Sequence, residues 1–147
     1  MPVDVVTEIV IGRPLAAVAE FSANPDNAPK WYANIKSVEW RSPPPLRAGS
    51  RVAFVAEFLG RKLAYTYEFA ELDLPNRLVM RTSEGPFPME TIYTWDSQGS
   101  EATHMTLRNR GSPAGFSAFV APFMTSAMRR ANTKDLRQLK ALLESAG

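Results

Sequence analysis

The chain has 147 residues, of which 45% are hydrophobic and 22% are charged, and its formal net charge is +2. This length suits one domain with a sizeable core, and this composition excludes an intrinsically disordered or fibrous chain. The absence of cysteine excludes disulfides, thiolate nucleophiles and thiolate metal sites.

The beginning of the chain predicts one strand and two short helices. Apolar side chains alternate with polar ones over residues 3–11, as a half-buried strand requires. Pro14 suits the first turn of a helix whose apolar face extends to about Ser22. Asn24 and Pro25 begin a second, shorter helical segment that leads to Trp31.

Six further strands are predicted after these helices. In order, they are residues 35–41, 50–59, 62–72, 77–83, 89–96 and 101–110. Gly60 with Arg61 predicts a tight hairpin, and the prolines at 43–45 predict a loop because proline donates no ladder hydrogen bond. No helix separates these strands, so we expect a seven-stranded antiparallel sheet and an α+β fold.

The final segment, residues 112–144, has the periodicity of a helix rather than a strand. Pro122 should kink this long helix or mark its beginning, and the apolar residues at 116–120 suggest a separate turn before it. The predicted apolar stripe of the helix contains Met124, Met128, Ala131, Leu139 and Leu142.

Several stretches along the chain are typical of one superfamily. They are residues 9–14 with Val18 and Phe21, residues 24–25 with Trp31, and residues 46–50, 71–78, 93–95, 128–132 and 135–136. With the order of elements, they resemble the START-like (SRPBCC) superfamily, and in particular its polyketide cyclase/dehydrase and lipid-transport family. The resemblance implies a helix-grip fold, a curved sheet wrapped around the last helix to enclose an apolar cavity. Residues 1–147 would form a single START-like ligand-binding domain, and no catalytic residues are implied.

The predicted concave face of the sheet is rich in aromatic residues and methionine, which suit a surface that adapts to an apolar ligand. The hydroxyls of Tyr65, Tyr67 and Tyr93 would orient a ligand oxygen, although a closed core is the alternative interpretation. We expect a cavity of roughly 300 Å3 or more. The expected lining residues are Trp31, Phe54, Phe58, Tyr65, Tyr67, Phe69, Met80, Thr91, Tyr93, Met105, Leu107, Met124 and Met128.

Few polar residues are candidates for chemistry. His104 is the only histidine and shares its side of the strand with Thr106 and Arg108, so we expect it to be an exposed bystander. This excludes a Ser–His–Asp relay and a two-histidine metal site, and we expect neither a metal nor a cofactor. Asn132 and Asp135 lie near the apolar stripe of the last helix. There they would tether the helix to a loop or an arginine, or else act as a general acid or base.

These observations favour a cytoplasmic protein that binds or carries a small hydrophobic or aromatic ligand of the lipid, polyketide or isoprenoid type. Scattered basic residues argue against a nucleic-acid partner. The basic side chains of the last helix predict a solvated face, with a transient contact with an anionic membrane surface as the alternative. One alternative function is a cyclase, aromatase or dehydratase acting on a polyketide-like substrate in the same cavity. Another is an interaction module resembling Hsp90 activators, which would have a filled core and an exposed apolar patch.

Overall fold

The computed structural model describes residues 3–58, 60–84, 88–111 and 121–146, and for residues 58, 121 and 122 it describes the backbone alone. Seven strands form one antiparallel sheet in the order β1-β7-β6-β5-β4-β3-β2. They are β1 (Val3–Ile11), β2 (Ile35–Trp40), β3 (Arg51–Phe58), β4 (Arg61–Asp73), β5 (Arg77–Glu84), β6 (Met89–Ser97) and β7 (Thr103–Gly111).

The predicted strands are confirmed, with small differences at their ends. The largest is at β7, which begins at Thr103 rather than at residue 101. The preceding turn occupies more residues because the backbone reverses at Gly99, whose φ of 77° lies in the left-handed region that favours glycine. Gly60, with a φ of 76°, has the same role in the predicted hairpin between β3 and β4.

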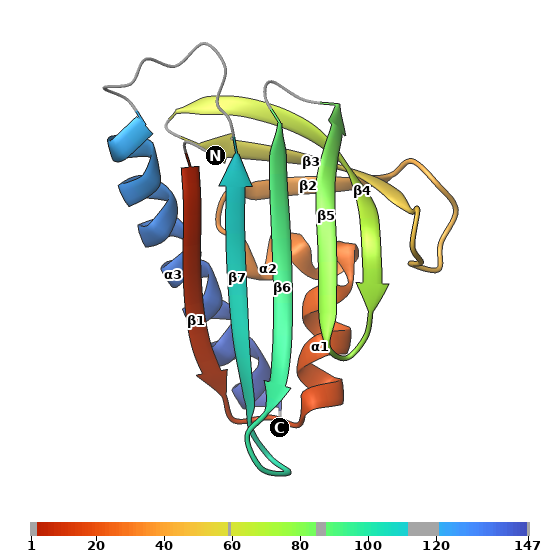
Figure 1. Cartoon of the computed structure of the whole chain (residues 1–147), viewed down its shortest axis with the longest axis vertical. Coiled ribbons are helices and arrows are strands. Elements are labelled where there is room, and N and C mark those ends of the chain that lie inside the picture. The colour runs from red at the N-terminus through yellow and green to blue at the C-terminus, as the bar shows by residue number, and fades with distance from the viewer. Residues whose placement is uncertain (1–2, 59, 85–87, 112–120, 147) are drawn as a thin grey trace.

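The helices cover one face of the curved sheet (Figure 1). After β1 come α1 (Leu15–Ala23), a 3-10 turn η1 (Pro25–Asn27) and α2 (Ala28–Trp31), and after β7 comes α3 (Ala121–Ala146). Pro122 lies in the first turn of α3, so it marks the beginning of the helix and does not kink it. The apolar turn expected at 116–120 lies outside the described residues.

The sheet bends along β4, which changes direction within its length (Figure 1). The pairing of β4 with β5 shifts register between Thr66 and Tyr67 and again between Phe69 and Glu71. An extra residue in one strand increases local twist and bends it. These two irregularities help to give the sheet the concave face that α3 and the short helices cover.

Two separate clusters of buried side chains occupy the space between sheet and helices. The larger includes Trp31, Trp95, Leu136 and Leu139 and lies against α1, α2 and the C-terminal half of α3. The smaller consists of Val3, Val5, Tyr65, Met89 and Met124. The core is therefore not one continuous cluster, and the candidate site is lined by members of both.

The buried stripe of α3 differs from the predicted one by a rotation about the helix axis. Met124 and Leu139 are buried as expected, but Ala131 and Leu142 are only half-buried. The predicted buried stripe contained only apolar residues, whereas the buried stripe in the structure also contains the polar residues Asn132 and Asp135. The buried positions between Met124 and the end of the helix are Asn132, Asp135, Leu136, Leu139 and Leu143.

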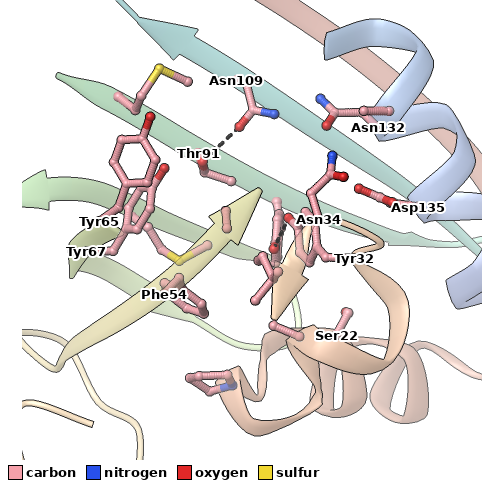
Figure 2. Close-up of a pocket in the computed structure, with 18 of the residues that line it drawn as sticks. Ser22, Tyr32, Asn34, Phe54, Tyr65, Tyr67, Thr91, Asn109, Asn132 and Asp135 are labelled. Atoms are coloured by element: carbon pink, nitrogen blue, oxygen red, sulfur yellow. Dashed lines mark hydrogen bonds between the residues drawn. The ribbon is translucent and has the colours of Figure 1, made fainter. Parts of the chain in front are cut away.

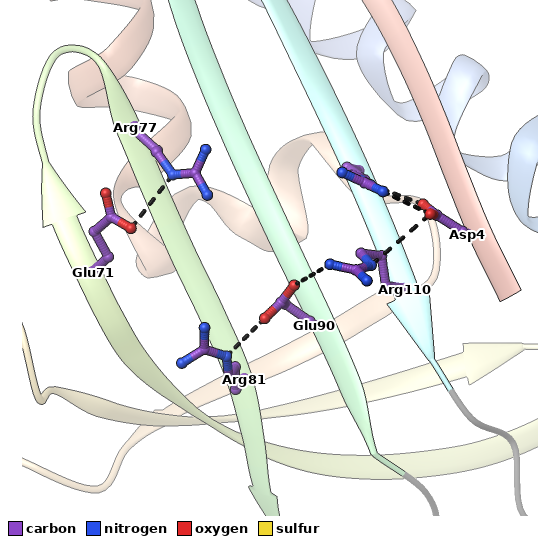
Figure 3. A network of polar contacts seen from close by, with 7 residues as sticks. Asp4, Glu71, Arg77, Arg81, Glu90 and Arg110 are labelled. Carbon is purple, nitrogen blue, oxygen red and sulfur yellow. Dashed lines mark hydrogen bonds and ion pairs between the residues drawn. The ribbon is translucent and has the colours of Figure 1, made fainter. Parts of the chain in front are cut away.

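The opposite face of the sheet carries ion pairs that link neighbouring strands (Figure 3). Arg108 on β7 binds both carboxylate oxygens of Asp4 on β1, at 2.8 and 2.6 Å. Glu90 on β6 accepts from Arg81 on β5 at 2.7 Å and from Arg110 on β7 at 3.5 Å. Exposed pairs of this kind contribute little stability each, so we assign this face no site.

Candidate ligand-binding site

A pocket of about 170 Å3, hereafter the central pocket, lies between the concave face of the sheet, α3 and the α1–β2 segment. Its apolar wall comes from strands β3 to β6, because alternate residues of a strand face the same side. Two methionines of α3 close it from the helix side. The predicted residues that line it are Phe54, Tyr65, Tyr67, Phe69, Met80, Thr91, Tyr93, Met124 and Met128.

Three other predicted lining residues lie elsewhere. Met105 and Leu107 are fully buried in the larger cluster, because the C-terminal half of α3 and the short helices cover that part of β7. Trp31 is also buried in the core, where its ring lies against Tyr32 at a centroid distance of 4.0 Å. The side chain of Phe58 lies outside the described residues.

The volume of the central pocket is smaller than the expected 300 Å3. Long side chains account for part of the difference, since Met89 and Met124 belong to a packed cluster and still reach the pocket. The space is therefore below the range of about 300–1,000 Å3 that is typical of ligand sites.

Polar groups gather on one side of the central pocket, as Figure 2 shows. The hydroxyl of Thr91 on β6 donates to Asn109 Oδ1 on β7 at 2.8 Å. Asn132 and Asp135 project from α3, and Asn34 from the segment before β2 lies beside them. Phe54 and the rings of Tyr65 and Tyr67 lie across the pocket from Asn34, Asn132 and Asp135, whereas Thr91 lies beside Tyr67 and hydrogen-bonds its hydroxyl. The pocket therefore has an apolar side and a polar side.

Tyrosine hydroxyls also face the central pocket. Tyr32 and Tyr93 share a hydrogen bond of 2.5 Å between their hydroxyl oxygens. Burial raises the pKa of Tyr32, Tyr65, Tyr67 and Tyr93 above the ordinary value of a phenol. These hydroxyls therefore stay protonated near neutral pH and act as hydrogen-bonding groups rather than as bases.

Asp135 joins α3 to the segment between α2 and β2. Its Oδ1 accepts a hydrogen bond from the backbone N–H of Ala33 at 3.0 Å, so the expected tether exists and its partner is a loop rather than an arginine. Burial raises the pKa of Asp135 to about 6, although the Ala33 bond and the nearby charge of Lys134 lower it. This carboxyl is therefore the acidic group of the central pocket that changes charge near neutral pH.

A second hollow opens outside the central pocket. Tyr32, Ile35 and Asp135 line both spaces, so these residues separate the interior from the surface there. The outer side is basic, with Lys30, Lys36, Lys134 and Arg137 around it. Of the basic residues predicted to form a solvated face of the last helix, Arg129, Arg130, Lys134 and Arg137 are exposed, and Lys140 is half-buried.

Sequence reasoning missed several residues of the polar side. Asn109 follows Met105 and Leu107 at strand spacing, so the alternation of β7 could have indicated that it faces inward, but it was not among the predicted lining residues. Tyr32 and Asn34 lie in or beside an irregular connection, where no periodicity predicts the direction of a side chain. Asn132 and Asp135 were recognised as near the apolar stripe but not as lining residues.

His104 lies on the outer face of β7, opposite Met105 and Leu107, as expected. Its Nε2 is 3.2 Å from Glu8 Oε1 and its Nδ1 is 4.0 Å from Asp96 Oδ2. The side chain is 24% exposed, less than expected, because β1 and β6 flank it.

We expect His104→Ala to change the free energy of unfolding by no more than about 0.5 kcal/mol, because its polar contacts are with the largely exposed carboxyl groups of Glu8 and Asp96. Ligand affinity should not change. Urea denaturation and ligand titration of the variant measure both effects, and a loss of binding would contradict the exclusion of histidine chemistry.

No group of three or more His, Cys, Asp or Glu side chains lies close enough to hold a metal ion within residues 3–58, 60–84, 88–111 and 121–146. Among the helices in that part of the chain, none is both long and apolar enough to cross a membrane.

A curved antiparallel sheet around a long C-terminal helix, with two short helices after the first strand, is the helix-grip fold of the START-like superfamily. A family model described as polyketide cyclase/dehydrase and lipid transport matches residues 2–144. The chain therefore belongs to this family, as its sequence stretches predicted.

Solved structures share the fold at low sequence identity. A protein from Thermus thermophilus is 21% identical with a TM-score of 0.84, covering 98% of this chain and 99% of that one. The Zhui aromatase/cyclase from a Streptomyces species is 15% identical with a TM-score of 0.81, covering 96% and 93%. A START superfamily protein from Mycobacterium smegmatis is 10% identical with a TM-score of 0.82, covering 98% and 99%. At these identities the likeness establishes the fold alone. No curated protein matches the chain in sequence.

Proposed function

We propose that the protein binds a compact, largely apolar molecule of one or two rings in the central pocket. The observation that carries this proposal is the pocket itself, which lies between two packed clusters and is lined by aromatic residues and methionines. A filled core would be expected of an interaction module that acts through its surface, so the pocket argues against that alternative. Membership of a family described by polyketide cyclases, dehydrases and lipid transport supports a ligand of the polyketide type.

The pocket's volume favours rings over long chains. Typical ligand sites measure about 300–1,000 Å3, and the central pocket has about 170 Å3. A bicyclic aromatic compound would need little rearrangement, whereas a long fatty acid would have to displace packed side chains. Competition between such compounds and a small naphthalene fluorophore, 1-aminonaphthalene, tests this preference.

We expect Met124→Trp to weaken the binding of 1-aminonaphthalene at least tenfold, because Met124 is buried and lines the pocket. The added ring can enter the adjoining pocket, so the cost in stability should lie near the lower end, about 1 kcal/mol, of the range for adding bulk to a packed core. Phe123→Trp is the matched control, since Phe123 is the neighbouring residue on the same helix and is 77% exposed. Fluorescence titration and urea denaturation of both variants measure the two effects.

Two outcomes would contradict the proposal. If Met124→Trp binds the fluorophore as tightly as Phe123→Trp does, the ligand does not occupy the central pocket. If palmitate competes and bicyclic compounds do not, the ligand is a lipid chain, and the pocket must rearrange to admit it.

A cyclase or dehydratase is the second candidate function, and one feature favours it. Asp135, whose pKa burial raises to about 6, lies in the pocket near the Tyr32–Tyr93 pair, where a carboxyl of that pKa can take and return a proton. An enzyme would convert a bound polyketide-like compound over time, and Asp135→Asn would abolish the conversion. Mass spectrometry of the mixture separates this candidate from a binding protein, which would return the compound unchanged.

A further inference from the structure

Asn132 is a buried polar residue whose side chain faces the central pocket. It projects from α3, is 5% exposed, and lines the pocket. Its Nδ2 is buried and has no hydrogen-bond partner among the described residues. Figure 2 shows its carboxamide pointing into the pocket toward Asn109.

The neighbours of Asn132 have other partners. Asn109 Oδ1 accepts from the hydroxyl of Thr91, and Asp135 Oδ1 accepts from the backbone N–H of Ala33. A buried N–H group without a partner is costly and rare in folded proteins. The carboxamide at 132 faces the polar side of the central pocket, where a molecule that enters the pocket can accept from its buried N–H.

We propose that Asn132 Nδ2 donates a hydrogen bond to an acceptor oxygen of the ligand, and that the pocket therefore selects compact cyclic ketones over the corresponding hydrocarbons. This inference rests on the proposed function, because it assigns an orientation to the ligand of the same pocket. The carbonyl oxygen faces α3, and the ring faces Phe54, Tyr65 and Tyr67 on the apolar side.

The test uses two ligands of the same skeleton, 1-tetralone with a carbonyl oxygen and tetralin without one. We expect the wild-type protein to bind 1-tetralone about tenfold more tightly than tetralin, the ratio that one hydrogen bond from a buried donor commonly gives. Asn132→Leu removes the donor. This variant should still bind tetralin, and the ratio of the two affinities should fall to about one. Asn132→Asp, of nearly the same shape and assayed together with the wild type at pH 9, where the carboxyl is ionised, replaces the donor with an acceptor oxygen and should also abolish the preference.

Thr133→Ala is the matched control, because Thr133 is the next residue of α3, does not line the pocket, and donates to the backbone of Arg129. The ratio of its affinities for 1-tetralone and tetralin should equal that of the wild type. Calorimetric titration gives the affinities, and thermal unfolding verifies that each variant is folded.

Each result decides a separate point. Two results overturn the role of Asn132 and leave the proposed function standing. In the first, both Asn132 variants still bind 1-tetralone about ten times more tightly than tetralin. In the second, the wild type binds both compounds with about the same affinity. Failure of the wild type to bind either compound overturns both. Loss of the preference in both Asn132 variants but not in Thr133→Ala supports the inference.

Discussion

Asp135→Asn is expected to raise the free energy of unfolding by about 2–3 kcal/mol at pH 7.5 and to change it little at pH 4 or below. Burial raises the pKa of Asp135 from 3.8 to about 6 in the folded protein. The folded protein therefore binds the proton more tightly than the unfolded chain. The stabilisation of the folded state by this bound proton is fully present below pH 3.8 and is lost as the pH rises through 6. A shift of about two pKa units corresponds to about 3 kcal/mol.

Asparagine retains an oxygen that accepts from the Ala33 N–H, so the substitution removes the buried charge and keeps the tether. Asp73→Asn is the control, because Asp73 is exposed at the end of β4 and the same substitution is therefore made outside the buried site. Urea denaturation at pH 4, 5, 6 and 7.5 gives the free energy of unfolding of each protein as a function of pH. If Asp135→Asn destabilises the protein at pH 7.5, the ionised carboxylate is stabilised in the folded state, and our account of its burial is wrong.

The second large effect is expected for Leu139→Ala, which should lower the free energy of unfolding by about 2–5 kcal/mol. Leu139 is fully buried in the larger cluster, at the end of α3 remote from Met124. Truncation there removes apolar contacts and leaves a cavity that neighbouring side chains fill incompletely. The midpoint of urea unfolding should fall while the slope of the transition stays constant, because the surface exposed on unfolding is nearly the same.

Leu142→Ala is the matched control, since Leu142 lies on the same helix three residues later and is only half-buried. Leu142→Ala should lower the free energy of unfolding clearly less than Leu139→Ala does. Equal costs would mean that Leu142 is packed as closely as Leu139, as expected if both belonged to the buried stripe that the apolar pattern predicted. That outcome would contradict the rotation of the helix described above.

The strands were predictable because the sheet imposes a period of two on nearly every segment. Alternation placed Phe54, Tyr67 and Tyr93 on the inner face, and they line the central pocket. The same alternation does not indicate how far a helix covers each strand. Met105 and Leu107 therefore share the predicted face with Asn109, yet of these three only Asn109 lines the pocket.

The polar side of the pocket was less predictable, because it depends on contacts between distant segments. Asp135 is buried because a backbone N–H of residue 33 meets it, an interaction that hydrophobic periodicity does not represent. Asp135 and the carboxamide of Asn132 are the two polar side chains within the buried stripe of α3. The pocket's volume also depends on packed rotamers of side chains such as Met89 and Met124, which sequence pattern does not specify.

The pairing of β1 with β7 has a consequence for how the chain acquires this structure. Thr7 and Leu107 are register partners that also share a side-chain hydrogen bond, although 100 residues separate them. On the ribosome, the first strand must wait for the last one, which takes roughly 5–20 s at synthesis rates of about 5–20 residues per second. During that time the alternating apolar face of β1 has no partner strand and is available to chaperones or to another nascent chain. Because this pairing joins the first and last strands of the chain, refolding of the complete chain should be slow, on the ms–s scale of proteins dominated by non-local pairing.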